Sequence, residues 1–281
     1  MAEIFDTFEK KHDYLICVDS DGCAMDTMDI KHFRCFGPCM VDEWGLDAWR
    51  GPILERWNEI NLYTMTRGVN RFKGLAQALS EIDAKYTPVD GAAEFAAWVK
   101  TAKELSNASV GREAENGAHP IFAKALAWSK AVNESIRALP AEEVKPFGGA
   151  KEGLAAAHAA ADVAVVSSAN RGAVEEEWNR FGLAEHVDIL LAQDAGTKAH
   201  CIAGLLKKGY DPKKVLMVGD APGDKDAADA NGVWYYPILV RHESESWEKL
   251  RTEGIAHLLD GTYEAFGAEC VREFYHNLGQ D

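Results

Sequence analysis

The stretch YLICVDSDGCAMDT, residues 14–27, decides the fold of this protein. Its apolar part, residues 14–19, is short and ends directly in acidic side chains, which is typical of a buried parallel strand whose carboxyl end faces a binding site. Three later segments have the same character: residues 162–168 (DVAVVSS), 187–193 (VDILLAQ) and 214–220 (KVLMVGD). A fifth, residues 233–240, contains Pro237, which places it at a sheet edge or makes it irregular.

Helical patterns follow the later strands, over residues 171–181, 198–208 and 224–230. Strands that alternate with helices through short loops favour a parallel sheet with helices on both faces. The sequence therefore predicts an α/β protein with a Rossmann-like, doubly wound parallel sheet.

One spacing interrupts this alternation. Asp19 and Ser167 are 148 positions apart, whereas Ser167 and Lys198 are only 31 apart. A crossover between parallel strands needs about a dozen residues or more, not a hundred. We therefore expect two domains: an α/β core of residues 1–30 and 147–281, and an inserted, mostly α-helical cap domain of residues 31–146. Apolar residues three or four apart predict cap helices over residues 68–82, 92–105 and 120–139.

Charge also separates the two parts. The 281 residues carry a net charge of −15, and the insertion has 15 basic and 15 acidic residues, so the whole excess lies on the α/β part. Such a surface repels nucleic acids and anionic membranes, and no apolar run is long enough to span a membrane. The acidic start lacks an apolar signal core, which favours a cytoplasmic location with six free thiols. The oligomeric state stays open.

Polar side chains lie at the carboxyl ends of four predicted strands: Asp19, Asp21, Ser167, Lys198, Asp220 and Asp224. Four carboxylates at one edge would repel each other unless a cation lay among them, and an all-oxygen donor set favours Mg²⁺. A hydroxyl and an ammonium group are partners for a phosphoryl group. One carboxylate can attack phosphorus, and a second can protonate the leaving oxygen and activate water.

In order and spacing, the four segments resemble the four motifs of the haloacid dehalogenase-like (HAD) superfamily. VDSDGCAMDT is similar to the first motif, DxDG followed by an acidic residue and Ser or Thr, here Asp26 and Thr27. VVSSANRG resembles the second, the Lys of GTKAH the third, and VGDAPGD the fourth, GDxxxD. Cys23 stands where the family usually has Thr or Val, and we expect it to pack as a small hydrophobe. The insertion resembles the family's helical cap in position alone.

The resemblance implies catalytic roles for four residues. Asp19 would be the nucleophile and a Mg²⁺ ligand. Asp21 would be the general acid and base, with its backbone carbonyl on the metal. Ser167 and Lys198 would hold the phosphoryl oxygens.

The same resemblance implies that Asp220 and Asp224 anchor Mg²⁺, one directly and the other directly or through water. Ser168, Asn170 and Arg171 are further candidates for substrate binding. Strand alternation lets only one of the two adjacent serines face the rim, and we favour Ser167.

These residues favour a Mg²⁺-dependent phosphatase that hydrolyses a phosphate monoester of a small metabolite through an aspartyl-phosphate intermediate. A phosphomutase is the main alternative, because Arg67, Arg71 and Lys73 could bind a second anionic group. A phosphonate hydrolase on the same core is disfavoured by Asp21, and a non-catalytic phosphometabolite-binding protein would be expected to lack a catalytic residue. The sequence does not identify the substrate.

Overall fold

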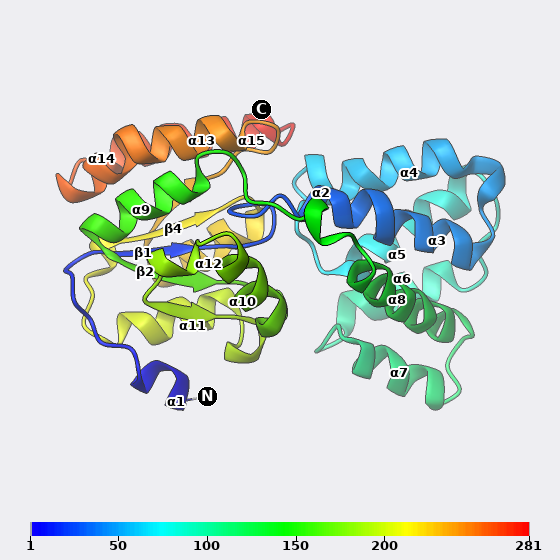
Figure 1. Cartoon of the computed structure of the whole chain (residues 1–281). Helices are drawn as coiled ribbons and strands as arrows, with labels where there is room; N and C mark the ends of the chain where they lie inside the picture. The colour runs from blue at the N-terminus through cyan, green and yellow to red at the C-terminus, as the bar shows by residue number, and fades with distance from the viewer. Residues whose placement is uncertain (1, 281) are drawn as a thin grey trace. The chain divides into compact units, whose positions relative to one another are not determined.

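The computed structural model of the chain describes residues 2–280 and contains a five-stranded sheet in the order β3-β2-β1-β4-β5, with every neighbouring pair parallel (Figure 1). The strands are β1 (Leu15–Val18), β2 (Asp162–Val166), β3 (Ile189–Leu191), β4 (Val215–Gly219) and β5 (Trp234–Pro237). The five predicted strands are all present. Each is shorter than predicted, and the residues that follow β1, β2 and β4 outside the strands are polar: Asp19, Ser167, Ser168 and Asp220. β5 is an edge strand, as Pro237 indicated.

The register brings the carboxyl ends of the central strands to one edge. Val18, the last residue of β1, pairs with Val165 in β2 and with Val218 in β4. Chain order runs outward from β1 through β2 and β3, then returns to the other side of β1 as β4. The winding therefore reverses between β1 and β4, and such a reversal opens the crevice where α/β sheets bind ligands.

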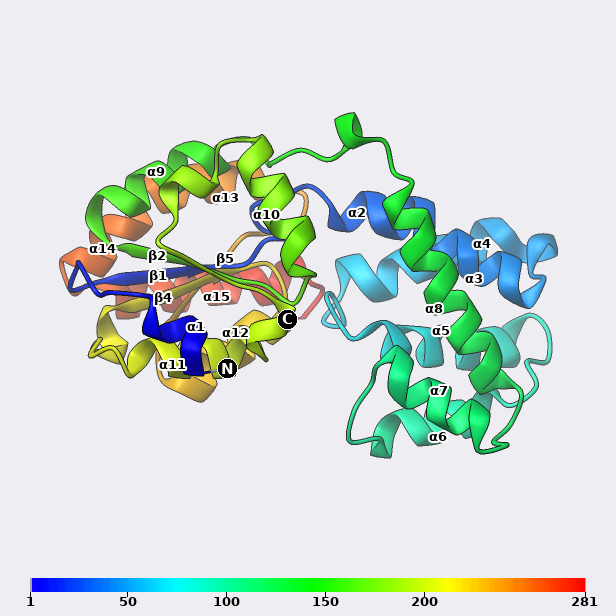
Figure 2. The ribbon, with the colours of Figure 1, turned by 60° about the horizontal axis from the view of Figure 1, so that its bottom comes forward.

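Helices cover both faces of this sheet. α9 (Ala150–Ala160) and α10 (Arg171–Arg180) lie on one face, and α11 (Lys198–Leu206) and α12 (Pro222–Asn231) lie on the other (Figure 2). The doubly wound, Rossmann-like α/β fold is thus confirmed. The remaining helices of this part are α1 (Ala2–Asp6), α13 (Glu243–Lys249), α14 (Ile255–Leu259) and α15 (Tyr263–Asn277).

The chain divides into two compact units. One runs to Met28 and resumes at Val144, and the other spans Asp29–Glu143, slightly shorter than the expected insertion of residues 31–146. We call them the α/β unit and the helical unit. The helices of the latter are α2 (Met28–Lys31), α3 (Gly37–Trp44), α4 (Arg50–Asn58), α5 (Arg71–Lys85), α6 (Ala92–Thr101), α7 (Asn107–Glu115) and α8 (Ile121–Arg137).

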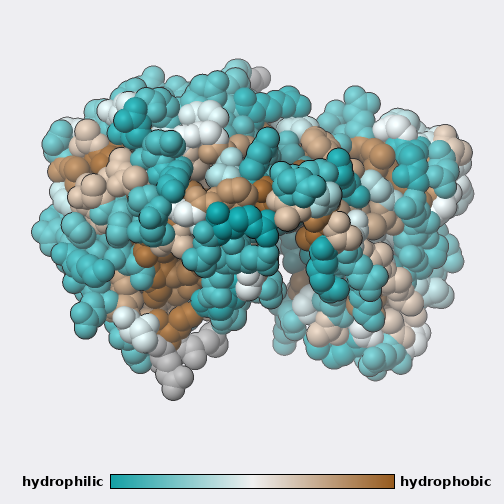
Figure 3. Space-filling model, viewed as in Figure 1, coloured by the Kyte–Doolittle hydropathy of each residue, from teal (hydrophilic) through white to brown (hydrophobic). Residues whose placement is uncertain are grey.

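The helical unit has an apolar core of its own. Trp57 and Trp128 are fully buried there, and their rings meet edge to face at 6.0 Å. Hydrophilic residues cover most of the visible surface of both units (Figure 3). Among residues 2–280 there is no helix with the length and apolar character needed to cross a membrane.

Capping residues explain where two predicted helices differ from those observed. The helix expected over residues 92–105 ends at Thr101, because Ala102 is extended, and Ser106 then caps the unpredicted α7 by accepting a hydrogen bond from Ser109 N. The helix expected from residue 68 begins at Arg71, because the Asn70 side chain caps it. Side-chain caps thus decide helix ends that apolar periodicity alone leaves uncertain.

The segments on either side of the insertion pair with each other. Asp26 N donates to Lys145 O at 2.8 Å, and Phe147 N donates to Ala24 O at 3.0 Å. The chain therefore leaves the α/β unit and returns to it at one place, and this arrangement lets an inserted unit with its own core fold independently.

We predict that residues 29–143, expressed alone, unfold in one cooperative thermal transition followed by circular dichroism. The emission of Trp57 and Trp128 should shift to the red in the same transition, because both indoles lose their apolar surroundings. A gradual, non-cooperative loss of helix would show that the helical unit needs the α/β unit to fold.

Candidate active site

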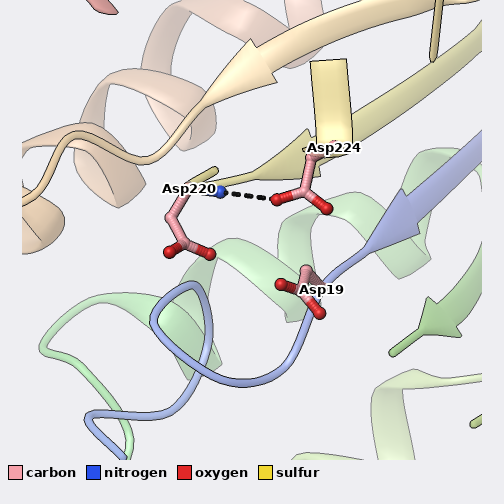
Figure 4. A group of neighbouring side chains, drawn as sticks. All are labelled: Asp19, Asp220 and Asp224. Atoms are coloured by element: carbon pink, nitrogen blue, oxygen red, sulfur yellow. Dashed lines mark hydrogen bonds between the residues drawn. The ribbon is translucent and has the colours of Figure 1, made fainter. Parts of the chain in front are cut away.

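Three carboxylates converge at the carboxyl edge of the sheet. Asp19, Asp220 and Asp224 are buried, and each offers an oxygen within 4.8 Å of those of the other two. Their side chains point toward one another (Figure 4). Asp19 follows β1 and Asp220 follows β4, so the cluster lies where the winding of the sheet reverses.

Local backbone structure holds each of the three. Asp19 N donates to Val218 O at 3.0 Å, which continues the β1–β4 ladder to the carboxylate. Asp224 lies in the first turn of α12, and its Oδ2 accepts hydrogen bonds from Asp220 N at 3.1 Å and Ala221 N at 3.0 Å. A carboxylate that caps a helix N-terminus is stabilised there by otherwise unpaired N–H groups. The cap therefore holds Asp224 in place.

Lys198 brings a positive charge into this cluster. Its Nζ lies 2.7 Å from Asp19 Oδ2 and also donates a hydrogen bond to Asp224 Oδ1. It is the first residue of α11, after Thr197, whose side chain accepts from His200 N. A positive charge at a helix N-terminus opposes the helix dipole. Such a local conflict is characteristic of functional positions.

Burial and charge shift the titration of this cluster. Burial raises the pKa of the Asp19 carboxyl well above its usual value, the charge of Lys198 lowers it, and the charges of Asp224 and Asp220 raise it further. Burial would lower the pKa of the Lys198 ammonium, but the charges of Asp19 and Asp224 outweigh that effect and raise it. With all three carboxylates ionised, one ammonium would leave two negative charges uncompensated. That excess favours a divalent cation.

The Asp21 carboxylate is not one of the three converging groups. Thr27 Oγ1 donates to Asp21 Oδ1 at 2.6 Å, and Thr27 is itself fully buried. The hydroxyl of the first motif's last residue therefore orients the Asp21 carboxylate.

Ser167 is the buried member of the two adjacent serines, and Ser168 is exposed. Ser167 Oγ accepts a hydrogen bond from Ala169 N at 3.1 Å, and no residue from 2 to 280 accepts its hydroxyl proton. Ser167 follows the strand beside β1, which places it at the same sheet edge as Asp19.

The other two substrate-binding candidates of this loop have structural partners. Asn170 caps α10, with its Oδ1 accepting from Gly172 N and Ala173 N. Arg171 Nε donates to Asp194 Oδ2 at 2.7 Å, which connects the loop after β2 to the one after β3.

Two further residues near the carboxylates, Cys23 and Gly219, contribute through packing. Cys23 is fully buried, and burial raises the pKa of its thiol well above the usual value, so it packs as the expected small hydrophobe. Gly219 precedes Asp220, and the sequence analysis assigned it no role. A Cβ at Gly219 would lie 2.4 Å from Asp224 Cγ, so only glycine lets the Asp224 carboxylate pack against the strand end.

We predict that Gly219→Ala lowers the free energy of unfolding by about 1–3 kcal/mol, because a methyl group there displaces a buried, hydrogen-bonded carboxylate. Gly223→Ala is the matched control, since its Cβ would meet nothing within 4 Å. In that helical position alanine should be neutral or stabilise the protein by about 0.5–1 kcal/mol. Urea unfolding of both variants measures the difference, and equal stabilities would contradict the packing argument.

Comparison with known proteins agrees with the motifs. The family model described as haloacid dehalogenase-like hydrolase matches residues 98–236. That range includes Ser167, Lys198, Asp220 and Asp224, and the segment of Asp19 lies before it. No curated protein matches the sequence of this chain.

Solved structures share the fold at low sequence identity. A haloacid dehalogenase-like family hydrolase from Streptococcus pneumoniae is 13% identical over 80% of this chain and 83% of its own, with a TM-score of 0.51. A protein from Lactobacillus delbrueckii subsp. bulgaricus with a phosphoglycolate phosphatase assignment is 14% identical over 81% and 86%, with a TM-score of 0.50. The family match over residues 98–236 confirms the resemblance to the haloacid dehalogenase-like hydrolases that the motifs implied, and the solved structures share the fold.

Proposed function

We propose that this protein is a Mg²⁺-dependent phosphatase that hydrolyses phosphate monoesters of small metabolites. The observation that carries the proposal is the buried cluster of Asp19, Asp220 and Asp224 around Lys198 at the crevice of the sheet. Asp21, two residues after Asp19 and oriented by Thr27, adds a carboxylate outside the cluster. Asp19 can therefore attack phosphorus while Asp21 donates and accepts the proton.

The donor set fits Mg²⁺. Its three carboxylates supply only oxygen, which hard divalent cations prefer, and their charge exceeds that of Lys198 by two. Asp19, Asp220 and Asp224 would hold the ion through their side chains, and Asp21 through its backbone carbonyl. Bound there, Mg²⁺ neutralises the carboxylates and draws electron density from the phosphoryl oxygens.

In the first half-reaction, an Asp19 carboxylate oxygen attacks phosphorus and the bond from phosphorus to the ester oxygen breaks. Asp21 gives its proton to that leaving oxygen, so the alcohol departs neutral. Lys198 donates hydrogen bonds to a phosphoryl oxygen, and the Ser167 hydroxyl proton, which has no acceptor among the described residues, donates to another. The product is an aspartyl phosphate on Asp19.

In the second half-reaction, Asp21, now ionised, takes a proton from water, and the oxygen of that water attacks phosphorus. The bond from phosphorus to the Asp19 oxygen breaks, which releases inorganic phosphate and restores the Asp19 carboxylate. Asp21 ends protonated, as it began. The two carboxylates thus have different tasks because only Asp19 lies in the charged cluster.

A phosphomutase remains the second candidate, and one observation in the helical unit favours it. Arg71 is partly buried, and its Nη1 donates only to neutral oxygens of Ser129 and Asn133. Burial lowers the pKa of this guanidinium, and no carboxylate among residues 2–280 forms an ion pair with it, which suits an added anion. Arg67 is fully enclosed and donates to Leu62 O, and Lys73 is exposed, so the three basic residues do not share one environment.

We predict that the wild-type protein releases phosphate from a few compounds in a panel of phosphorylated metabolites that includes phosphoglycolate. Asp19→Asn should lower this rate at least about 10³-fold, because an amide cannot attack phosphorus, while the near-isosteric side chain preserves the fold. Asp13→Asn changes a carboxylate that is 72% exposed and should retain full activity.

Wild-type rates in Asp19→Asn would exclude Asp19 as the nucleophile. If no compound releases phosphate but Asp19 takes up label from a phosphodonor, the mutase is favoured. No release and no labelling would favour a binding protein.

We predict that Mg²⁺ raises the thermal midpoint of unfolding above that measured in EDTA. At a concentration one hundred times its dissociation constant, the ion adds about 2.7 kcal/mol of stability. Asp220→Asn should lose most of this increment, because one charged ligand is removed, and Asp13→Asn should keep it. Identical midpoints in Mg²⁺ and EDTA for the wild type would contradict the metal assignment.

A further inference from the structure

The loop that carries Asp19 and Asp21 folds back on itself. Ser20 O accepts hydrogen bonds from Cys23 N, Ala24 N and Met25 N, at 3.3, 3.0 and 2.9 Å. One backbone carbonyl therefore closes a compact turn directly after β1. The direction of both carboxylates depends on how this turn is oriented.

Three consecutive side chains of the turn have three separate partners. Asp19 contacts Lys198 of α11, and Asp21 accepts from Thr27. Ser20, between them, is fully buried, and its Oγ accepts a hydrogen bond from Trp178 Nε1 at 2.9 Å.

Trp178 is suited to hold Ser20. It belongs to α10, is fully buried, and its indole N–H has one proton to donate. Within residues 2–280, no other side chain bonds the Ser20 hydroxyl, and Ser20 Oγ is the only acceptor of the indole proton. Each buried group therefore depends on the other, and losing either one leaves the remaining group unpaired.

A second indole holds the other end of the turn. Trp247 Nε1, from α13, donates to Cys23 O at 2.9 Å, and Trp247 is also fully buried. The two contacts differ in kind. Trp247 bonds a backbone carbonyl, whereas Trp178 bonds the one side chain that separates the two carboxylates.

We infer that Trp178 is a positioning residue of this site, which acts through Ser20 to set the direction of the Asp19 and Asp21 carboxylates. The inference deepens the proposed function and rests on it, because the geometry being set is that of the cation and phosphoryl site. Partners that orient metal ligands by hydrogen bonds typically change metal affinity or activity about 10- to 100-fold when removed.

The test is a double-mutant cycle of Trp178→Phe and Ser20→Ala, with Mg²⁺ affinity measured by calorimetry. Each single variant should weaken Mg²⁺ binding about 10-fold and lower kcat at least about 10-fold, with KM changed less than about 3-fold. The double variant should bind Mg²⁺ no more weakly than the single variant with the lower affinity, because both substitutions remove the same hydrogen bond. Ser20→Ala removes only a hydroxyl, so it keeps the test valid if Trp178→Phe fails to fold.

Hydrogen exchange of the metal-free protein gives a readout independent of activity. The amides of residues 19–25 should exchange about 10-fold faster in both single variants than in the wild type. Trp128→Phe is the matched control, because this fully buried indole in the helical unit also donates one hydrogen bond, to Phe36 O at 3.1 Å. It should leave Mg²⁺ affinity and loop exchange unchanged.

The outcomes separate the two proposals. Wild-type Mg²⁺ affinity and loop exchange in both single variants would overturn the positioning role alone. Additive losses in the double variant would do the same, since they would show that Trp178 does not act through Ser20. Failure of the wild type to bind Mg²⁺ would overturn the proposed function and this inference with it.

Discussion

The repulsion among three buried carboxylates is the constraint on which the site depends. Asp19, Asp220 and Asp224 lie within 4.8 Å of one another, away from water, and Lys198 compensates only one of their charges. Burial strengthens such repulsion, because water no longer screens it. The protein therefore holds an electrostatically unfavourable arrangement in place, and a bound cation would relieve the remaining repulsion.

Backbone hydrogen bonds of the α/β unit hold the carboxylates together despite this repulsion. Asp19 continues the ladder between β1 and β4, and Asp224 caps the helix that begins beside it. Gly219 leaves the space that this cap occupies. These backbone hydrogen bonds fix the main chain of Asp19 and the side chain of Asp224. Only Lys198 reaches the cluster through a long side chain, and it does so from a helix end where its charge is otherwise unfavourable.

The sequence analysis was most accurate where one physical rule dominated. Buried parallel strands need continuous apolar runs, so all five strands were predicted, and Pro237 indicated an edge strand because it cannot donate to a ladder. The sequence analysis was wrong about the ends of two helices. The helix expected over residues 92–105 ends at Thr101, and α7 follows after Ser106, because a serine cap competes with helical continuation. Apolar periodicity does not report such side-chain bonds.

For the site, the sequence by itself determined which chemical groups stand at strand ends, and hence the type of reaction they suit. Motif order also identified the family, because the spacing of its residues follows from the winding of the sheet. Only the tertiary structure decided that three carboxylates converge while that of Asp21 bonds Thr27, and that Trp178 holds Ser20 across 158 positions of sequence. The reason is physical: strand periodicity is a local property, whereas a buried polar group is satisfied by whichever distant partner the packed core brings to it.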